Sequence, residues 1–209
     1  MKKLLFLLPV IILFVTACGT RELQEARYKE KITQLVPRAK AHQIQTKADF
    51  QVAMEDLSTY VMLPGSNLMN DYTKLQRRYK QAEKARRQTQ YFIQEIDERS
   101  SEMFRNWKRG LDRYENNELR YQSLSNYQQS QTQYQDFIQA MRLSEAKMQV
   151  ILDRYNDQLL FISQNMNPQS ISRMQNDVYA LDAEVTELSN LIDRSVLYAD
   201  QFLRTLNRP

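Results

Sequence analysis

Apolar residues recur every three or four positions along the C-terminal part of the chain. This spacing puts them on one face of an α-helix and matches the a and d positions of a coiled coil over about five heptads. The stripe consists of Ile171, Met174, Val178, Leu181, Val185, Leu188, Ile192, Ser195, Ala199, Phe202 and Leu206. Pro168 precedes it and fits a first helical turn, where its missing N–H has no partner to lose. The pattern predicts a helix over about residues 168–207.

Similar stripes run through the three preceding segments. One stripe consists of Leu68, Tyr72, Leu75, Tyr79, Ala82, Arg86, Thr89, Ile93, Ile96, Ser100, Met103 and Trp107. The next consists of Tyr134, Ile138, Met141, Glu145, Met148, Leu152, Tyr155, Leu159, Ile162 and Met166. A less regular stripe, nearer the N-terminus, consists of Ile44, Phe50, Met54, Leu57 and Val61. They predict helices over about residues 67–115, 118–166 and 38–63.

Helix-breaking residues are few and fall between these segments. The chain has three Gly and five Pro, and its breaks lie at Pro37, Pro64-Gly65, Asn116-Asn117 and Asn167-Pro168. Because the breaks are short, neighbouring helices must run antiparallel. We therefore predict an all-α fold for residues 38–209, an elongated antiparallel up-down four-helix bundle with coiled-coil packing. Its longest helices would span about 70 Å at 1.5 Å per residue.

The turn near residue 116 sets the register of the two middle helices. Facing residues should have numbers that sum to about 231 in an antiparallel pair. This rule puts Arg86 opposite Glu145, and these are the charged residues within the two stripes. We expect a structural ion pair between them that fixes the register. The alternative is that both side chains extend to water at the edge of the bundle.

The N-terminus has the pattern of a lipoprotein signal. Lys2 and Lys3 precede an apolar run that is too short for a membrane span, and the run ends in Val15-Thr16-Ala17-Cys18. A small residue directly before the single Cys resembles a bacterial lipobox. We therefore predict a signal peptide over residues 1–17 and acylation of Cys18, for example with palmitate. The alternative is an ordinary signal peptide followed by an unmodified Cys.

This signal predicts where the protein is located. Gly19 follows the lipobox in place of the Asp that resembles an inner-membrane retention signal, so we expect the outer membrane, on its periplasmic face. Residues 18–37 would form the lipid anchor and a tether or short helix. Removal of residues 1–17 takes away two of the 29 basic residues, so 27 remain against 25 acidic ones, a net charge of +2. Such a balance, in an exported protein, gives no support to a nucleic-acid partner.

The supply of chemically active residues is small. A single Cys and a single His exclude an internal disulfide and multi-cysteine zinc sites, and three Gly leave no phosphate-binding loop. His42 stands alone, and we expect it to be a solvated helix residue and not a metal ligand. The sequence predicts that the protein is not an enzyme, and it suggests no cofactor, metal or catalytic residue.

Basic residues cluster at the start of the second long helix. The candidate contacts for an anionic partner are Lys74, Arg77, Arg78, Lys80, Lys84 and Arg87. One interpretation is a solvated helix face with some intrahelical pairing. The other is contact with cell-wall carboxylates or lipid phosphates.

Three tyrosines farther along the chain lie at a helical spacing. Tyr121, Tyr127 and Tyr134 are about seven residues apart and share one helix face. They form either core and rim packing or an aromatic contact surface.

Several short motifs carry a resemblance to a known family. They are Ala140-Met141-Arg142, Asp157-Gln158-Leu159-Leu160-Phe161, Asn165-Met166-Asn167, Ile171-Ser172, Ala199-Asp200-Gln201-Phe202 and the turn Pro64-Gly65-Ser66-Asn67-Leu68. With them the chain resembles a family of uncharacterised secreted helical proteins of Gram-negative bacteria, a domain of unknown function. The resemblance implies a periplasmic helical bundle, often lipid-anchored. It transfers no catalytic residue.

These observations lead to one functional hypothesis and one alternative. We expect an outer-membrane-anchored periplasmic helical lipoprotein that acts as a structural or protein-interaction module of the cell envelope. Its partners would be the membrane, through acylated Cys18, and an envelope protein. The alternative is a binder of peptidoglycan or anionic lipid through the basic helix face. The pattern specifies neither the partner protein nor the oligomeric state.

Overall fold

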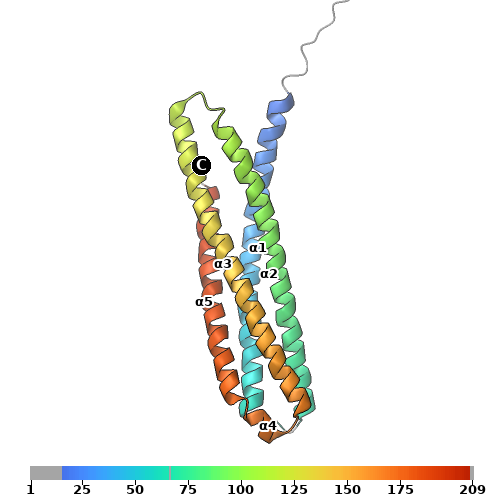
Figure 1. Cartoon of the computed structure of the whole chain (residues 1–209). Helices are drawn as coiled ribbons and strands as arrows, with labels where there is room; N and C mark the ends of the chain where they lie inside the picture. The colour runs from blue at the N-terminus through green and yellow to red at the C-terminus, as the bar shows by residue number, and fades with distance from the viewer. Residues whose placement is uncertain (1–15, 66, 208–209) are drawn as a thin grey trace, which may run out of the picture.

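The protein is an all-α rod of four long helices. The computed structural model describes residues 16–65 and 67–207. Its helices are α1 (Thr16–Met62), α2 (Leu68–Leu111), α3 (Asn117–Gln164), the short α4 (Pro168–Ser172) and α5 (Gln175–Leu206). Helix α1 packs against α2 and α5, and α3 packs against the same two helices (Figure 1). This arrangement confirms the predicted antiparallel up-down bundle.

The rod has two distinct ends. The start of α1 and the α2–α3 turn lie at one end, and α4 and the α1–α2 turn lie at the other (Figure 1). We call them the N-terminal end and the α4 end. Helix α2 has 44 residues, which corresponds to a length of about 66 Å. None of the helices in residues 16–65 and 67–207 combines the length and the apolarity of a membrane span.

Asparagines in or just after three of the predicted breaks cap the helices that follow. The side-chain oxygens of Asn67, Asn116 and Asn167 accept hydrogen bonds from the N–H groups of Asn70, Leu119 and Ser170, at 3.1, 3.2 and 2.9 Å. An amide at this position satisfies an N–H group that has no carbonyl partner within the helix. Three of the four sequence breaks are therefore true helix starts.

The predicted break at Pro37 is wrong. Helix α1 runs through it without interruption. A proline inside a helix removes the hydrogen bond to the carbonyl four residues earlier, here that of Thr33. Pro37 is exposed, so water can replace that bond, while Leu35 and Val36 beside it are buried in the core. The packed bundle therefore begins before residue 38, and residues 27–37 are part of it and not a tether.

The structure describes only the last two residues of the predicted signal peptide. Residues 1–15 lie outside the described residues, and Thr16 and Ala17 begin α1. The backbone of Cys18 is in the first turn of that helix. The predicted acylation site is therefore located at the N-terminal end of the rod.

The last predicted helix is divided in two. Sequence periodicity indicated one helix over 168–207, but Arg173 and Met174 form a turn between α4 and α5. Ile171 and Met174 are both buried, at 0% and 3% exposure, on either side of this turn. Because the apolar spacing continues across it, the stripe gives no sign of the interruption.

The interior consists of two apolar cores. The α4-end core extends from Phe50 in α1 and Leu75 in α2 to Ile162 in α3 and Val178 in α5. The N-terminal-end core is richer in aromatic rings and contains Phe92, Phe104, Tyr134, Phe137 and Phe202. Nearly all the apolar residues of the predicted stripes are in one of these cores or pack against it. Ile44 is an exception: it is 52% exposed, and Gln43 occupies the core position instead.

Candidate functional site

A layer of buried polar side chains separates the two apolar cores. It consists of Gln43, Thr46, Thr89, Ser144 and Ser195, all with 0% exposure. Gln43 connects three helices, because its Oε1 accepts a hydrogen bond from Ser195 Oγ at 2.7 Å and its Nε2 donates one to Ser144 Oγ at 3.3 Å. We call these five residues the polar layer. A buried amide with both ends bonded is stabilising only in this alignment of the helices.

His42 extends the layer toward α2. Its Nε2 donates a hydrogen bond to the carbonyl of Ala85 at 3.0 Å, and its ring lies 5.4 Å from that of Phe92. The expectation of a solvated histidine is therefore wrong, since His42 connects α1 and α2. Among the described residues no group of three His, Cys, Asp or Glu side chains could hold a metal ion.

The structure places Arg86 and Glu145 in an ion pair at the edge of this layer. Arg86 Nη1 donates to Glu145 Oε1, and the two side chains are 19% and 20% exposed. Their neighbours in sequence, Ala85 and Ser144, take part in the polar contacts described above. The register rule from the sequence therefore paired Arg86 with Glu145, and both lie at the level of the polar layer.

Half of the predicted basic cluster is neutralised within the bundle. Lys74 and Arg78 both donate to Asp56 on α1, each at 2.7 Å. Partial burial opposes ionisation of Asp56, but these two hydrogen bonds outweigh it and hold the pKa of the carboxyl below its ordinary value. Arg87 pairs with Glu83 one turn earlier at 2.7 Å. The cluster is thus partly a structural seam between α1 and α2.

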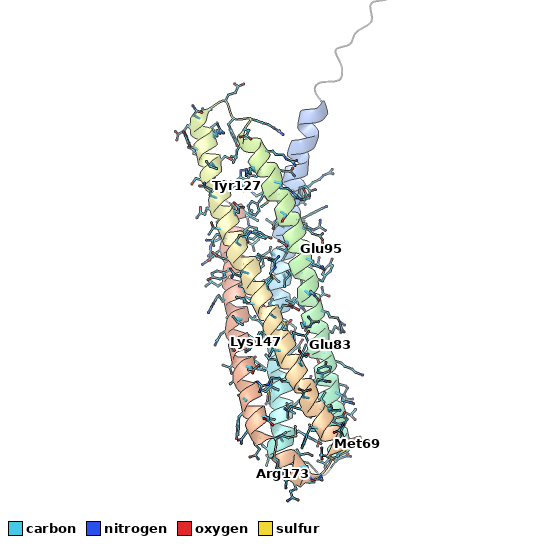
Figure 2. All side chains as sticks on the ribbon, in the orientation of Figure 1. Met69, Glu83, Glu95, Tyr127, Lys147 and Arg173 are labelled. Atoms are coloured by element: carbon cyan, nitrogen blue, oxygen red, sulfur yellow. The ribbon has the colours of Figure 1, made fainter. Side chains whose placement is uncertain are left out.

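The other half of the cluster forms a continuous stripe. Arg77, Lys80 and Lys84 are exposed and have no ion-pair partner within the part of the chain that the structure describes. Their spacing of three and four residues puts them on one face of α2. Glu83, which is labelled on α2 in Figure 2, is paired with Arg87 and does not neutralise them. We call Arg77, Lys80 and Lys84 the basic stripe.

Aromatic rings fill the interior toward the N-terminal end. Phe104 stacks on Trp107 with a centroid distance of 6.5 Å. Tyr127, which is labelled on α3 in Figure 2, packs edge-on against both rings at 5.8 Å. Tyr134 is buried, and its hydroxyl donates to Asp97. Burial, together with this hydrogen bond, raises the pKa of the Tyr134 hydroxyl.

The predicted tyrosine face changes character along α3. Tyr134 is 3% exposed, Tyr127 is half-buried and Tyr121 is 70% exposed. Packing in the core therefore accounts for the first two rings, and Tyr121 remains free to contact something outside the bundle. The spacing of seven identified the shared face, but burial depends on where α5 ends.

Comparison with known families gives a match over nearly the whole bundle. The model of a family described as a protein of unknown function (DUF2959) matches residues 20–206. The match covers every helix of the bundle except the first four residues of α1. Comparison with curated proteins finds no match, and comparison with solved structures finds none.

Proposed function

The chain belongs to the DUF2959 family, and from this premise we propose that it is a lipid-anchored rod of the bacterial cell envelope. Acylated Cys18 would hold it in the outer membrane, on the periplasmic side. The rod would act as a structural or protein-interaction module.

The observation that carries this proposal is the position of Cys18 in the rod. Its backbone is in the first turn of α1, at the N-terminal end, and α1 then continues for 47 residues in all to the α4 end. Two or three acyl chains on Cys18 would give stable attachment to a bilayer. The α4 end would then stand about 65 Å from the attachment point, since each helical residue adds about 1.5 Å.

The α4 end carries the kind of surface that a protein partner contacts. Leu63, Met69 and Tyr179 are 77%, 58% and 61% exposed, and they belong to the segments that meet at this end. Met69 and Arg173 are labelled there in Figure 2. Large exposed apolar and aromatic side chains are enriched in interface cores. This end supports display of a contact surface away from the membrane.

Replacement of Cys18 tests the anchor. We expect Cys18→Ser to move the protein from the membrane fraction to the soluble periplasmic fraction, because no thiol remains for acylation. Fractionation followed by immunoblotting measures the shift. Gly19→Asp is the matched control, and it should keep the protein membrane-bound but shift it to the inner membrane. Retention of Cys18→Ser in the membrane fraction would contradict the anchor.

A separate experiment addresses the protein partner. Crosslinking of the lipidated protein in intact cells would identify it.

The basic stripe favours a second candidate function, binding of peptidoglycan. Lys84 lies 27 residues before the end of α2, so the stripe begins about 40 Å from the N-terminal end. Lipid phosphates of the anchoring membrane are out of reach for an upright rod at that distance. Cell-wall carboxylates, which are free anions between the membranes, fit the position and the sign of the charges.

Neutralising the basic stripe tests this candidate. Three exposed ion pairs of about 0.5 kcal/mol each should make retention on purified peptidoglycan about tenfold weaker in Arg77→Gln/Lys80→Gln/Lys84→Gln. Added salt should weaken the wild type in the same way. A control with equal charge loss, Lys29→Gln/Lys31→Gln/Arg38→Gln on exposed positions of α1, should bind like the wild type. Equal binding by both triple variants would contradict a role for the stripe.

A further inference from the structure

The α2–α3 hairpin extends beyond the four-helix part of the rod. Phe202 near the end of α5 meets Tyr134 and Phe137 of α3, with centroid distances of 5.7 and 6.2 Å. Leu206, the last residue of α5, is therefore level with about residue 130 of α3. The first turns of α3 and the last turns of α2 continue past this level without α5 beside them (Figure 1). Residues 117–130 of α3 correspond to about 20 Å of helix.

The end of this hairpin has both apolar and cationic side chains on its surface. We call residues 108–121 the hairpin tip. Tyr114, Leu119 and Tyr121 are 41%, 50% and 70% exposed. The exposed cations of the tip are Lys108, Arg109, Arg113 and Arg120, against the acids Asp112, Glu115 and Glu118. Arg120 lies 3.4 Å from Asp112, and the other three cations have no ion-pair partner among the described residues.

The hairpin tip is level with the residue expected to carry the lipid. Side-chain contacts between α1 and α2 join Asp49 to Gln81 and Asp56 to Lys74, so facing residues have numbers that sum to about 130. This register puts Cys18 opposite Asp112. Figure 1 shows the start of α1 and the α2–α3 turn at the same end of the rod.

We propose that the hairpin tip docks on the phospholipid surface in which acylated Cys18 is anchored. Tyr114, Leu119 and Tyr121 enter the headgroup region, and the cations contact lipid phosphates. This inference rests on the proposed lipid anchor. Tyrosine suits this position because its ring is apolar and its hydroxyl is polar, and Arg and Lys extend from an interface toward phosphate.

A weak contact is sufficient for this docking. Once Cys18 is in the bilayer, contact of the tip with the same surface is intramolecular, and short tethers give effective concentrations in the millimolar range. Three exposed side chains and a few contacts between cations and lipid phosphates at an anionic surface then hold the tip in place. Two attachment points restrict the tilt of the rod, whereas the acyl anchor alone leaves it free to lean.

Site-directed labelling of the full lipidated protein tests the docking. Cys18 is the single Cys and its thiol is blocked by acylation, so Tyr121→Cys provides the only free thiol for an environment-sensitive fluorophore. In phosphatidylethanolamine–phosphatidylglycerol vesicles we expect a blue shift and at least about threefold quenching by brominated lipids. The matched control, Tyr179→Cys at the α4 end, should show neither. Adding Tyr114→Ser and Leu119→Ser to the labelled protein should remove most of the quenching.

Each other outcome overturns a defined part of the inference. Vesicle flotation without quenching at position 121 leaves the anchor intact and refutes the docking. Failure to float refutes the lipid anchor and the docking with it. A blue shift without quenching by brominated lipids, seen only when an envelope extract is added, would assign the tip to a protein partner and also refute docking on lipid.

Discussion

Glu145→Arg is expected to lower the free energy of unfolding by about 3 kcal/mol, close to the cost of leaving a buried charge without its partner. The substitution puts a second guanidinium beside Arg86, where both side chains are only about one-fifth exposed. It also places the repulsion next to Ser144 and the polar layer. Little rearrangement can relieve it, because Gln43 already holds α1, α3 and α5 in alignment at this level.

Denaturant titration of three variants separates the ion pair from a general effect of charge. The swapped double variant Arg86→Glu/Glu145→Arg restores the attraction and should recover most of the lost stability. Glu98→Arg, the same reversal at an exposed position of α2, should stay within about 0.5 kcal/mol of the wild type. A double variant no more stable than Glu145→Arg alone would refute a structural role of the pair.

Phe137→Ala should be the most destabilising truncation in the N-terminal-end core, at about 3–5 kcal/mol. Phe137 is 0% exposed, and its ring lies 6.2 Å from that of Phe202 on α5. Removal of the ring leaves a cavity between α3 and α5, and rigid helices on either side collapse into it only in part. The loss combines the transfer free energy of the ring with the cost of this cavity.

The same truncation on the outside of α3 provides the control. Phe161 is 39% exposed, so Phe161→Ala should cost less than about 1 kcal/mol. Thermal unfolding followed by circular dichroism measures both variants, and their helix content before unfolding should match. Similar losses for the two variants would show that Phe137 is not part of a tightly packed core.

The sequence was sufficient to predict the architecture because the apolar spacing is regular. Apolar residues recur every three or four positions, and Gly and Pro are few, so the chain forms long amphipathic helices. Because the breaks between these helices are short, they pack as an antiparallel bundle. Helix starts were predictable where Asn67, Asn116 and Asn167 act as caps. The continuation of α1 through Pro37 was not predictable, because it depends on Pro37 lying on the side of α1 that faces water.

The candidate functional surfaces were only partly predictable. Sequence located the basic cluster, but only the contact with Asp56 shows that Lys74 and Arg78 belong to the α1–α2 seam. The hairpin tip was not identified, because its exposure follows from the position where α5 ends. The polar layer left a weak trace: Thr89 and Ser195 are polar residues within two of the apolar stripes, and the Arg86–Glu145 pair lies close to the same level. Gln43 left none, since it is outside the stripe assigned to its helix.

The polar layer also restricts how the length of this protein can change. Above and below it the cores are apolar, and one layer of Leu, Ile or Phe resembles the next. Gln43 forms hydrogen bonds with Ser144 and Ser195 in only one alignment of α1 with α3 and α5. A seven-residue insertion in α1 alone, between this layer and a turn, would therefore move that turn away from the helix ends that it now contacts. Homologous rods of different height should therefore gain or lose whole heptads in matched sets across the helices, with Gln43 and its two serines still facing one another.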